Sequence, residues 1–293
     1  MKKLHFILNP IAGHGTSLEA FSRMEVLLKE RHIDYTVYKT ARPGHAKELV
    51  KAAIEDGAQL VVAAGGDGTV HEVAGAMAHT GIPMGVFPCG TGNDAARPLC
   101  IPKEPEAVLH LLLSASPQPV DMGMANGTLF LNVAGFGFDV DVLINTERYK
   151  KRFNKGMTAY ILGLLRALLK LRLIDIKVHT PDGDFTSRAL IAAIANGTHI
   201  GGGMNIAPQA DPTDGLFDVC IASNVNRLTV FKILPQFIKG KHVGLPVIKY
   251  FRCSEISFTS ESPVPVQLDG EIIESTPVAF KILPGALMMV TGL

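Results

Sequence analysis

The chain has few cysteines, little charge and no apolar run long enough to cross a membrane. Its four cysteines form no C-x-x-C pair, which argues against a zinc site and against a disulfide framework. The first apolar run ends at Asn9-Pro10, too early for a signal peptide. These absences favour a cytoplasmic protein with reduced thiols.

Charge of either sign is scarce. Charged residues make up 19% of the 293 positions, the formal net charge is +1, and 47% of residues are hydrophobic. The near-neutral balance argues against nucleic acid as a partner. The length suits two domains, and the apolar content suits an enzyme that handles an apolar substrate.

The most informative stretch is an apolar strand at 60–64, followed by Gly65, Gly66, Asp67, Gly68 and Thr69 and then by a helical pattern. Glycines let the backbone approach an anion, and a helix N-terminus presents unpaired N–H groups to phosphate oxygens. A carboxylate at this place would repel phosphate unless a cation lay between them. The stretch therefore predicts a nucleoside triphosphate bound with magnesium. The alternative is a tight turn in which Asp67 caps the helix.

A second run, 82–94, repeats this design. A short strand precedes Gly90, Thr91 and Gly92, and Asn93 and Asp94 follow at an expected helix start. Two such turns at successive strand ends would line one crevice of an open α/β sheet. Asn93 and Asp94 could equally be ordinary N-caps. The first loop, Gly13-His14-Gly15, has Leu18 where the dinucleotide fingerprint needs a third small residue, and no G-x-x-x-x-G-K-[ST] loop occurs in the chain.

Periodicity divides the chain in two. In residues 1–122, apolar runs at 4–8, 35–38, 60–64 and 84–87 alternate with helical patterns at 18–31 and 46–56, which predicts a doubly wound α/β nucleotide-binding domain. Residues 123–279 are β-rich, and we interpret them as a mainly antiparallel β-sandwich that binds the substrate. Its expected strands are 128–134, 174–180, 185–195, 218–222, 256–259 and 264–268.

Five blocks resemble motifs of the family that contains diacylglycerol kinases, sphingosine kinases and related bacterial lipid kinases. They follow the family's order over nearly the whole chain: Asn9-Pro10 with Gly13 and Gly15, residues 65–69, residues 90–94, residues 214–218, and Leu268-Asp269-Gly270-Glu271. The resemblance implies a two-domain architecture like that of lipid kinases and NAD kinases. It also implies that the C-terminal segment 280–293 returns to the first domain.

The resemblance further implies which residues bind ATP. The first loop, with Asn9, Pro10 and Gly13, would contact the phosphates, and Thr40, at the end of the second strand, would approach the nucleotide. The rest of the expected ATP site consists of Gly65, Gly66, Asp67, Gly68, Thr69, Glu72, Thr91, Asn93 and Asp94.

Phosphoryl transfer to a hydroxyl needs an acceptor for its proton. Asp269 follows an expected strand and adjoins Gly270, so that Asp269 and Glu271 can both project from the turn. Together with the resemblance, this makes Asp269 the leading general base and Glu271 its support or rival, with Asp67 as a further catalytic candidate. The alternative is a polar hairpin tip.

Residues 211–218 supply several oxygens suited to a hard cation. By resemblance, the Asp214 side chain and the carbonyls of Asp211 and Leu216 would hold a structural Mg²⁺ that reaches Asp67 through water. Asp94 and Asp121 match acidic positions of the family's cleft. A turn leading into a strand is the alternative.

Between residues 148 and 172 the chain has no acidic residue, and apolar residues recur there at helical spacing. A basic amphipathic helix suits the surface of an anionic bilayer, although a core-packed helix with solvated basic residues fits the same pattern. The basic residues are Arg148, Lys150, Lys151, Arg152, Lys155, Arg166, Lys170 and Arg172.

These observations and the resemblance predict an ATP- and Mg²⁺-dependent lipid kinase that converts diacylglycerol to phosphatidic acid. Sphingoid bases, monoacylglycerol, phosphatidylglycerol and polyprenols stay open as acceptors. The alternatives are a soluble NAD kinase and a nucleotide sensor that docks at membranes. We expect a cytoplasmic, peripherally membrane-associated protein whose partners are a lipid substrate and an anionic membrane surface. Whether it forms a homodimer is open.

Overall fold

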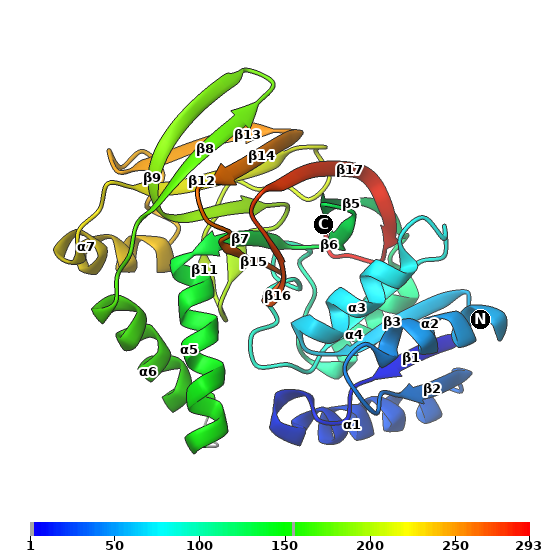
Figure 1. Cartoon of the computed structure of the whole chain (residues 1–293). Helices are drawn as coiled ribbons and strands as arrows, with labels where there is room; N and C mark the ends of the chain where they lie inside the picture. The colour runs from blue at the N-terminus through cyan, green and yellow to red at the C-terminus, as the bar shows by residue number, and fades with distance from the viewer. Residues whose placement is uncertain (1–2, 154–155) are drawn as a thin grey trace. The chain divides into compact units, whose positions relative to one another are not determined.

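A computed structural model describes residues 3–153 and 156–293 of the chain. The chain forms two compact units, which are described separately (Figure 1). Unit 1 contains Met1–Met122, Asp211–Gly215 and Leu283–Leu293, and unit 2 contains Gly123–Ala210 and Leu216–Ile282. The short segment Asp211–Gly215 thus belongs to the N-terminal unit, although most of the surrounding sequence belongs to unit 2.

Unit 1 is built on a parallel sheet with the strand order β2-β1-β3-β4. Its strands are β1 (Leu4–Leu8), β2 (Tyr35–Lys39), β3 (Leu60–Gly65) and β4 (Met84–Pro88). Strands β1, β3 and β4 are buried along their whole length, as central parallel strands covered on both faces are. The helices that alternate with them are η1 (Ala12–Gly15), α1 (Thr16–Glu30), α2 (His45–Glu55), α3 (Asp67–Met77) and α4 (Pro105–Ser114).

Successive side chains of a strand point to opposite faces of the sheet, and each face packs against its own helices. Phe6 of β1 packs with Phe21 of α1, at 5.1 Å between ring centroids, in a core that also takes Val108 and Leu112 of α4. Helices α2 and α3 pack against each other instead. This arrangement confirms the predicted doubly wound α/β fold and leaves the carboxyl ends of the parallel strands as the place for a ligand.

Unit 2 is mainly antiparallel. The long strand β9 pairs with β8 along its first half and with β7 and β12 along its second half, so that it bridges two parts of the sandwich. The principal strands are β7 (Val133–Gly137), β8 (Ile174–Thr180), β9 (Gly183–Ala195), β12 (Phe217–Ser223), β13 (Ile248–Cys253), β14 (Glu255–Ser260), β15 (Pro265–Leu268) and β16 (Glu271–Ser275). The short strands are β6 (Thr128–Phe130), β10 (His199–Ile200) and β11 (Met204–Asn205). This confirms the predicted β-sandwich.

The core of unit 2 is aromatic on one side and covered by helices on the other. Phe130 stacks on Phe217 at 5.8 Å, and Phe136 meets Phe258 edge to face at 5.1 Å. A second cluster packs strand side chains against α6 (Gly156–Leu169) and α7 (Arg227–Ile238). The remaining helix of unit 2 is α5 (Phe138–Phe153). No helix among the described residues combines the length and the apolar character needed to cross a bilayer.

Several expected elements differ in the structure. The single basic helix expected at 148–172 is the end of α5 followed by α6; Lys155 and the side chains of Lys150, Lys151 and Arg152 lie outside what is described. The strand expected at 128–134 is interrupted at 131–132, because those backbone N–H groups bond to Asp269 instead of to a strand. The sequence pattern also predicts two strands near the C-terminus, at 278–283 and 287–291, but the structure has a single strand there, β17 (Val278–Met289). Strands β17 and β5 (Gln118–Ala125) each have residues in both units.

Candidate functional site

The carboxyl ends of β1 and β3 hold Asn9 against the first glycine turn. The Asn9 N–H donates to the Ala64 carbonyl at 2.9 Å, and its Nδ2 donates to Thr69 Oγ1 at 3.1 Å. The Asn9 carbonyl accepts from Ser17 Oγ at 2.8 Å, which ties the loop after β1 to α1. Thr40 continues β2, with its N–H on the Leu8 carbonyl at 2.9 Å. The structure therefore brings these predicted residues to one edge of the sheet.

The glycine turns pack backbone against backbone. A Cβ added to Gly90 would lie 2.4 Å from the Gly66 Cα, and one added to Gly13, whose φ is +59°, would lie 2.5 Å from the Cys89 carbonyl oxygen. The Cys89 N–H donates to the Gly65 carbonyl at 2.8 Å. Three loops thus converge where side chains have no room, and close approach to the backbone is what phosphate binding at such turns needs.

The first turn opens on the N-terminus of α3. Gly66 is its N-cap and has no side chain with which to cap the helix. Asp67 Oδ1 accepts instead from the Ala95 N–H at 3.1 Å, which links the first turn to the segment after the second. Asp67 is the first residue of α3, so Gly66 and not Asp67 occupies the N-cap position. Exposed N–H groups at a helix N-terminus attract anions.

The second turn is fixed by Asn93. Its Oδ1 accepts from the Gly90 N–H and its Nδ2 donates to the Gly90 carbonyl, both at 2.9 Å, so the side chain braces the loop that holds Thr91. Asp94 is buried and pairs with Arg97 at 3.6 Å. The helix start expected at these residues is wrong: the chain turns from Asp94 to Cys100, and α4 begins only at Pro105.

Glu72 lies one turn into α3, but its carboxylate serves another helix. It accepts from the Gly44 N–H at 2.7 Å and from the Ala46 N–H at 3.1 Å, at the start of α2. A carboxylate at a helix N-terminus satisfies backbone donors that the helix itself leaves unpaired. The described contacts therefore give Glu72 a capping role.

Asp121 organises the acidic loop within unit 1. Its Oδ2 accepts from the Gly215 N–H and its Oδ1 from the Gly285 N–H, both at 2.7 Å, and its own N–H donates to the Pro212 carbonyl at 2.8 Å. The residue is 3% exposed. One buried carboxylate thus holds two segments that are distant in sequence from it and from each other.

The expected magnesium ligands fit the ion in donor type. The Asp211 side chain accepts from the Thr213 N–H at 3.0 Å and from its hydroxyl at 2.7 Å, so the side chain is used in its own turn, and only the carbonyl suits an outside ligand. Asp214 is exposed. Oxygen donors of these kinds are those that Mg²⁺ and Ca²⁺ take in proteins. Within residues 3–153 and 156–293, no three His, Cys, Asp or Glu side chains gather as a metal site, so backbone carbonyls and waters would have to complete this one.

Asp269 and Gly270 form the two-residue turn between β15 and β16, where Leu268 pairs with Glu271. Their φ angles of 51° and 90° are both left-handed, as hairpin turns of this length require. The Asp269 Oδ1 accepts from the Asn132 and Val133 N–H groups at 2.8 and 3.0 Å, and its Oδ2 accepts from the Leu131 N–H at 2.8 Å. The carboxylate is thus held in one orientation by backbone donors, whereas Glu271 is exposed.

Sequence reasoning missed a second carboxyl behind this turn. Gln267 donates its Nε2 to Asp139 Oδ2 at 3.2 Å and accepts from the Gly270 N–H at 2.7 Å. Desolvation raises the pKa of the Asp139 carboxyl to about 6, against hydrogen bonds from the Val140 N–H and Gln267 that lower it. Gly135 was the available signal, since a Cβ there would lie 3.1 Å from Asp139 Oδ2 and a glycine within a strand often marks a close approach.

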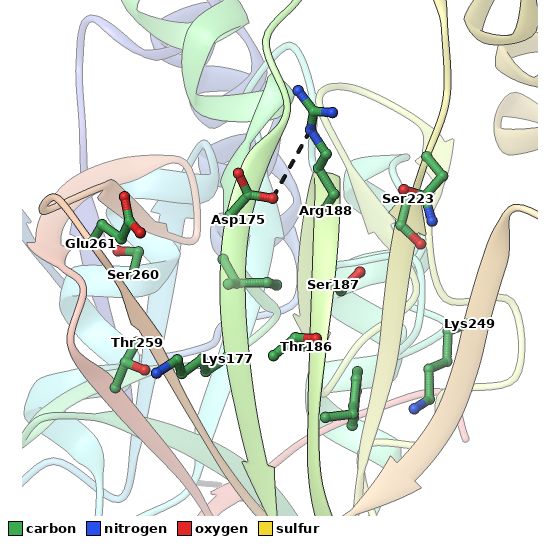
Figure 2. Close-up of a pocket in the computed structure, with 13 residues that line it drawn as sticks. Asp175, Lys177, Thr186, Ser187, Arg188, Ser223, Lys249, Thr259, Ser260 and Glu261 are labelled. Carbon is green, nitrogen blue, oxygen red and sulfur yellow. Dashed lines mark ion pairs between the residues drawn. The ribbon is translucent and has the colours of Figure 1, made fainter.

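Unit 2 also holds a groove that contains none of the predicted site residues (Figure 2). It has a volume of about 710 Å³ and lies over β8, β9, β13 and β14. Within it, Arg188 of β9 and Asp175 of β8, on neighbouring strands, pair at 3.9 Å, and Lys249 Nζ lies 3.0 Å from the ring centroid of Phe185. Because most of its lining is charged or hydroxylated, the groove does not suit an acyl chain.

Comparisons with known proteins agree with this arrangement over the whole chain. The diacylglycerol kinase catalytic domain matches residues 3–125, and the YegS C-terminal NAD kinase beta sandwich-like domain matches residues 132–291. A diacylglycerol kinase of Mycobacterium tuberculosis is 31% identical over 98% of this chain and 94% of its own length. A probable YegS-like lipid kinase of Pseudomonas aeruginosa is 34% identical over 88% of this chain and 85% of its own.

A solved structure agrees as well. The crystal structure of a putative diacylglycerol kinase from Bacillus anthracis matches with a TM-score of 0.80 at 24% identity, over 99% of this chain and 95% of that one, which shows the fold. Family models and relatives at this level of identity and coverage confirm the resemblance seen in the five motifs. The chain belongs to the family of bacterial diacylglycerol kinases and YegS-like lipid kinases, and it is a kinase.

Proposed function

We propose that the protein transfers the γ-phosphate of ATP to the hydroxyl of diacylglycerol and releases phosphatidic acid and ADP. The observation that carries this proposal is the convergence of three glycine turns at the N-terminus of α3, whose N-cap is Gly66. Support for the acceptor comes from the relatives in Mycobacterium tuberculosis and Bacillus subtilis, which are both named diacylglycerol kinase.

In this proposal, backbone N–H groups bind the phosphates of ATP. They come from the loop with Asn9, Pro10 and Gly13, from the turn that starts at Gly65, and from the turn that Asn93 braces. Thr40 and the exposed Thr91 would contact the rest of the nucleotide. Donors fixed by neighbouring backbone need no rearrangement when negative charge moves during transfer, which is the main protein contribution to phosphoryl transfer.

Asp269 is the proposed general base, with Glu271 as its rival. The acceptor oxygen forms a bond to the γ-phosphorus, the bond from that phosphorus to the β–γ bridging oxygen breaks, and the hydroxyl proton goes to the carboxylate. Three backbone donors, the N–H groups of Leu131, Asn132 and Val133, fix the orientation of the Asp269 carboxylate. The Glu271 side chain is exposed, so it is freer than that of Asp269 but its position is less well defined.

Magnesium would be held by the Asp214 carboxylate and the carbonyls of Asp211 and Leu216, on the loop that Asp121 fixes to unit 1. When bound, the ion would screen phosphate charge that Asp67 alone would repel. Asp67 and Asp94 are the acidic residues whose repulsion of the phosphates the ion would offset.

The proposed working place is the cytoplasmic face of a membrane, where diacylglycerol is available to a peripheral enzyme. All four cysteines, Cys89, Cys100, Cys220 and Cys253, are free in the structure. Arg148 of α5, which is exposed, and Arg166 of α6 support contact with anionic lipid.

A panel of acceptors tests the function. With labelled ATP and magnesium, the wild type should label diacylglycerol in mixed micelles faster than sphingosine, monoacylglycerol, phosphatidylglycerol or a polyprenol, and should not label NAD. Preferred labelling of another lipid would correct the acceptor and keep the lipid kinase. Preferred labelling of NAD, or binding of ATP without transfer to any acceptor, would overturn the proposal.

A further inference from the structure

Exposed large apolar side chains concentrate on two helices of unit 2. Leu169 of α6 is 70% exposed, and Leu228 and Phe231 of α7 are 73% and 59% exposed. Side chains of this kind normally lie inside a folded protein, and several together mark an interaction surface. The full set on these helices is Ile161, Leu165, Leu169, Leu228, Phe231 and Ile238.

On both helices the exposed apolar residues form one stripe. On α6 they follow the spacing i, i+4, i+8, and on α7 they stand at 228, 231 and 238, which puts them on one face. Other residues of the same helices are buried: Leu168 of α6 and Val230, Ile233 and Phe237 of α7 belong to the same hydrophobic cluster. Each helix is therefore already satisfied on its inner face and has a second apolar stripe that the described structure leaves uncovered.

The two stripes belong to neighbouring helices. The Arg227 guanidinium, at the start of α7, donates to the Leu169 carbonyl, at the end of α6, at 2.7 Å. Figure 1 shows both helices on the same side of unit 2. We call these six exposed apolar residues, together with Lys170, Lys232 and Lys239, the α6/α7 face.

The two helices that form this face carry basic residues and no acidic ones. Neither helix contains Asp or Glu, and no Asp or Glu occurs anywhere from residue 219 to residue 254. Lys232 and Lys239 alternate with the apolar side chains of α7, and Lys170 follows the last residue of α6; all three are exposed. Arg172 is excluded, because Asp141 of α5 pairs with it at 2.8 Å.

We infer that the α6/α7 face inserts into the surface of an anionic lipid bilayer, with α7 contributing Leu228 and Phe231 to the apolar layer and Lys232 and Lys239 to the headgroups. Apolar stripes flanked by lysines, on helices too short to span a bilayer, have the chemistry of interfacial helices. The inference rests on the proposed function for its purpose, which is to bring the enzyme to a lipid acceptor. Its physical claim, that the face binds a bilayer, stands on the exposure and charge alone.

The absence of tryptophan from the chain allows a direct test. A Phe231→Trp variant would carry one fluorophore on the face, and Val26→Trp would carry one at a similarly exposed site, 54% exposed, on α1 of unit 1. With vesicles that contain phosphatidylglycerol, the emission of Phe231→Trp should shift to the blue and be quenched by brominated acyl chains. Val26→Trp should show neither effect. Equal responses, or no response from Phe231→Trp, would overturn the inference.

A second experiment measures binding without a probe. The double variant Leu228→Ser, Phe231→Ser should lower vesicle sedimentation by about 10-fold or more, since burial of each large apolar side chain favours the bilayer. Val26→Ser should sediment like the wild type. Unchanged sedimentation of the double variant would contradict the inference, as would a concentration-dependent blue shift of Phe231→Trp without lipid, because that would mean that a second copy of the chain covers the face.

Activity separates this inference from the proposed function. The double variant should phosphorylate diacylglycerol in vesicles more slowly, but should phosphorylate a dispersed short-chain diacylglycerol at the wild-type rate. Equal loss on both substrates would contradict a docking role. If the wild type phosphorylates neither while Phe231→Trp still enters the bilayer, the docking face stands and the kinase proposal fails.

Discussion

The Gln267 side chain reaches Asp139 with its nitrogen, at 3.2 Å, while its oxygen accepts from the backbone of the hairpin turn at Gly270, at 2.7 Å. Asp139 therefore supports the proposed catalytic turn through one neutral amide. Burial raises the pKa of its carboxyl to about 6. A carboxyl with a raised pKa in the folded state favours folding when protonated, and that contribution falls as the pH rises from about 4 to about 6.

The first prediction concerns stability against pH. Asp139→Asn should be more stable than the wild type by about 3 kcal/mol at about pH 8, because the variant avoids a desolvated charge, and the difference should shrink to less than about 1 kcal/mol at about pH 4. Urea unfolding at the two pH values measures it. Asp182→Asn, in the exposed turn between β8 and β9, is the control and should show no such trend. A pH-independent difference for Asp139→Asn would contradict the prediction.

The second prediction separates the two candidate bases. Asp269→Asn should lose most transfer activity and also about 1–3 kcal/mol of stability, since an amide NH₂ would face backbone N–H donors. Glu271→Gln should leave stability unchanged because the side chain is exposed. Parallel unfolding and transfer assays decide the roles. If Glu271→Gln alone abolished transfer, Glu271 would replace Asp269 as the base.

The third prediction concerns the contact between the glycine turns. Gly90→Ala should weaken ATP binding by at least about 10-fold, because the new Cβ would meet the Gly66 Cα and push the turns apart. Gly75→Ala is the matched control, since a Cβ there meets nothing within 4 Å and should stabilise α3 by about 1 kcal/mol. Calorimetric titration with ATP and thermal unfolding measure both effects. Wild-type affinity in Gly90→Ala would remove the turns from the ATP site.

The fourth prediction concerns the metal. Magnesium should raise the melting temperature of the wild type, because a ligand that binds only the folded state stabilises it, and Asp214→Ala should lose that rise. Thr213→Ala, on the same loop but without a charged oxygen, is the control. The measurement needs no activity. An equal rise in the wild type and in Asp214→Ala would exclude Asp214 as a ligand.

The local sequence pattern was enough to predict the parts of the fold that have strong short-range signals. The buried strands of unit 1 carry strong short-range signals and formed as expected, and the hairpin tip given as the alternative for Asp269 and Gly270 is also present. Helix α7 was missed, since Pro235 interrupts its pattern and its N-cap is a single Asn226, whose Oδ1 accepts from the Thr229 N–H at 2.9 Å. A proline within a helical pattern normally predicts an end to the helix.

The contacts of the candidate site could not be predicted from the sequence. Asp269 binds backbone donors about 137 positions earlier, and Asp121 holds Gly215 and Gly285, so the partners are set by tertiary structure. The role of Glu72 as a cap for α2 depends likewise on the packing of two helices. Motifs pointed to the right segments, but the atoms that each carboxylate binds follow from the fold.

Transfer of labelled γ-phosphate from ATP to a total lipid extract tests the central claim most directly. The wild type, Asp269→Asn and Asp182→Asn would be compared in mixed micelles with magnesium, and the products resolved by chromatography. We predict one labelled lipid that comigrates with phosphatidic acid for the wild type and for Asp182→Asn, and none for a folded Asp269→Asn. No labelled lipid from a wild type that binds ATP would contradict the account.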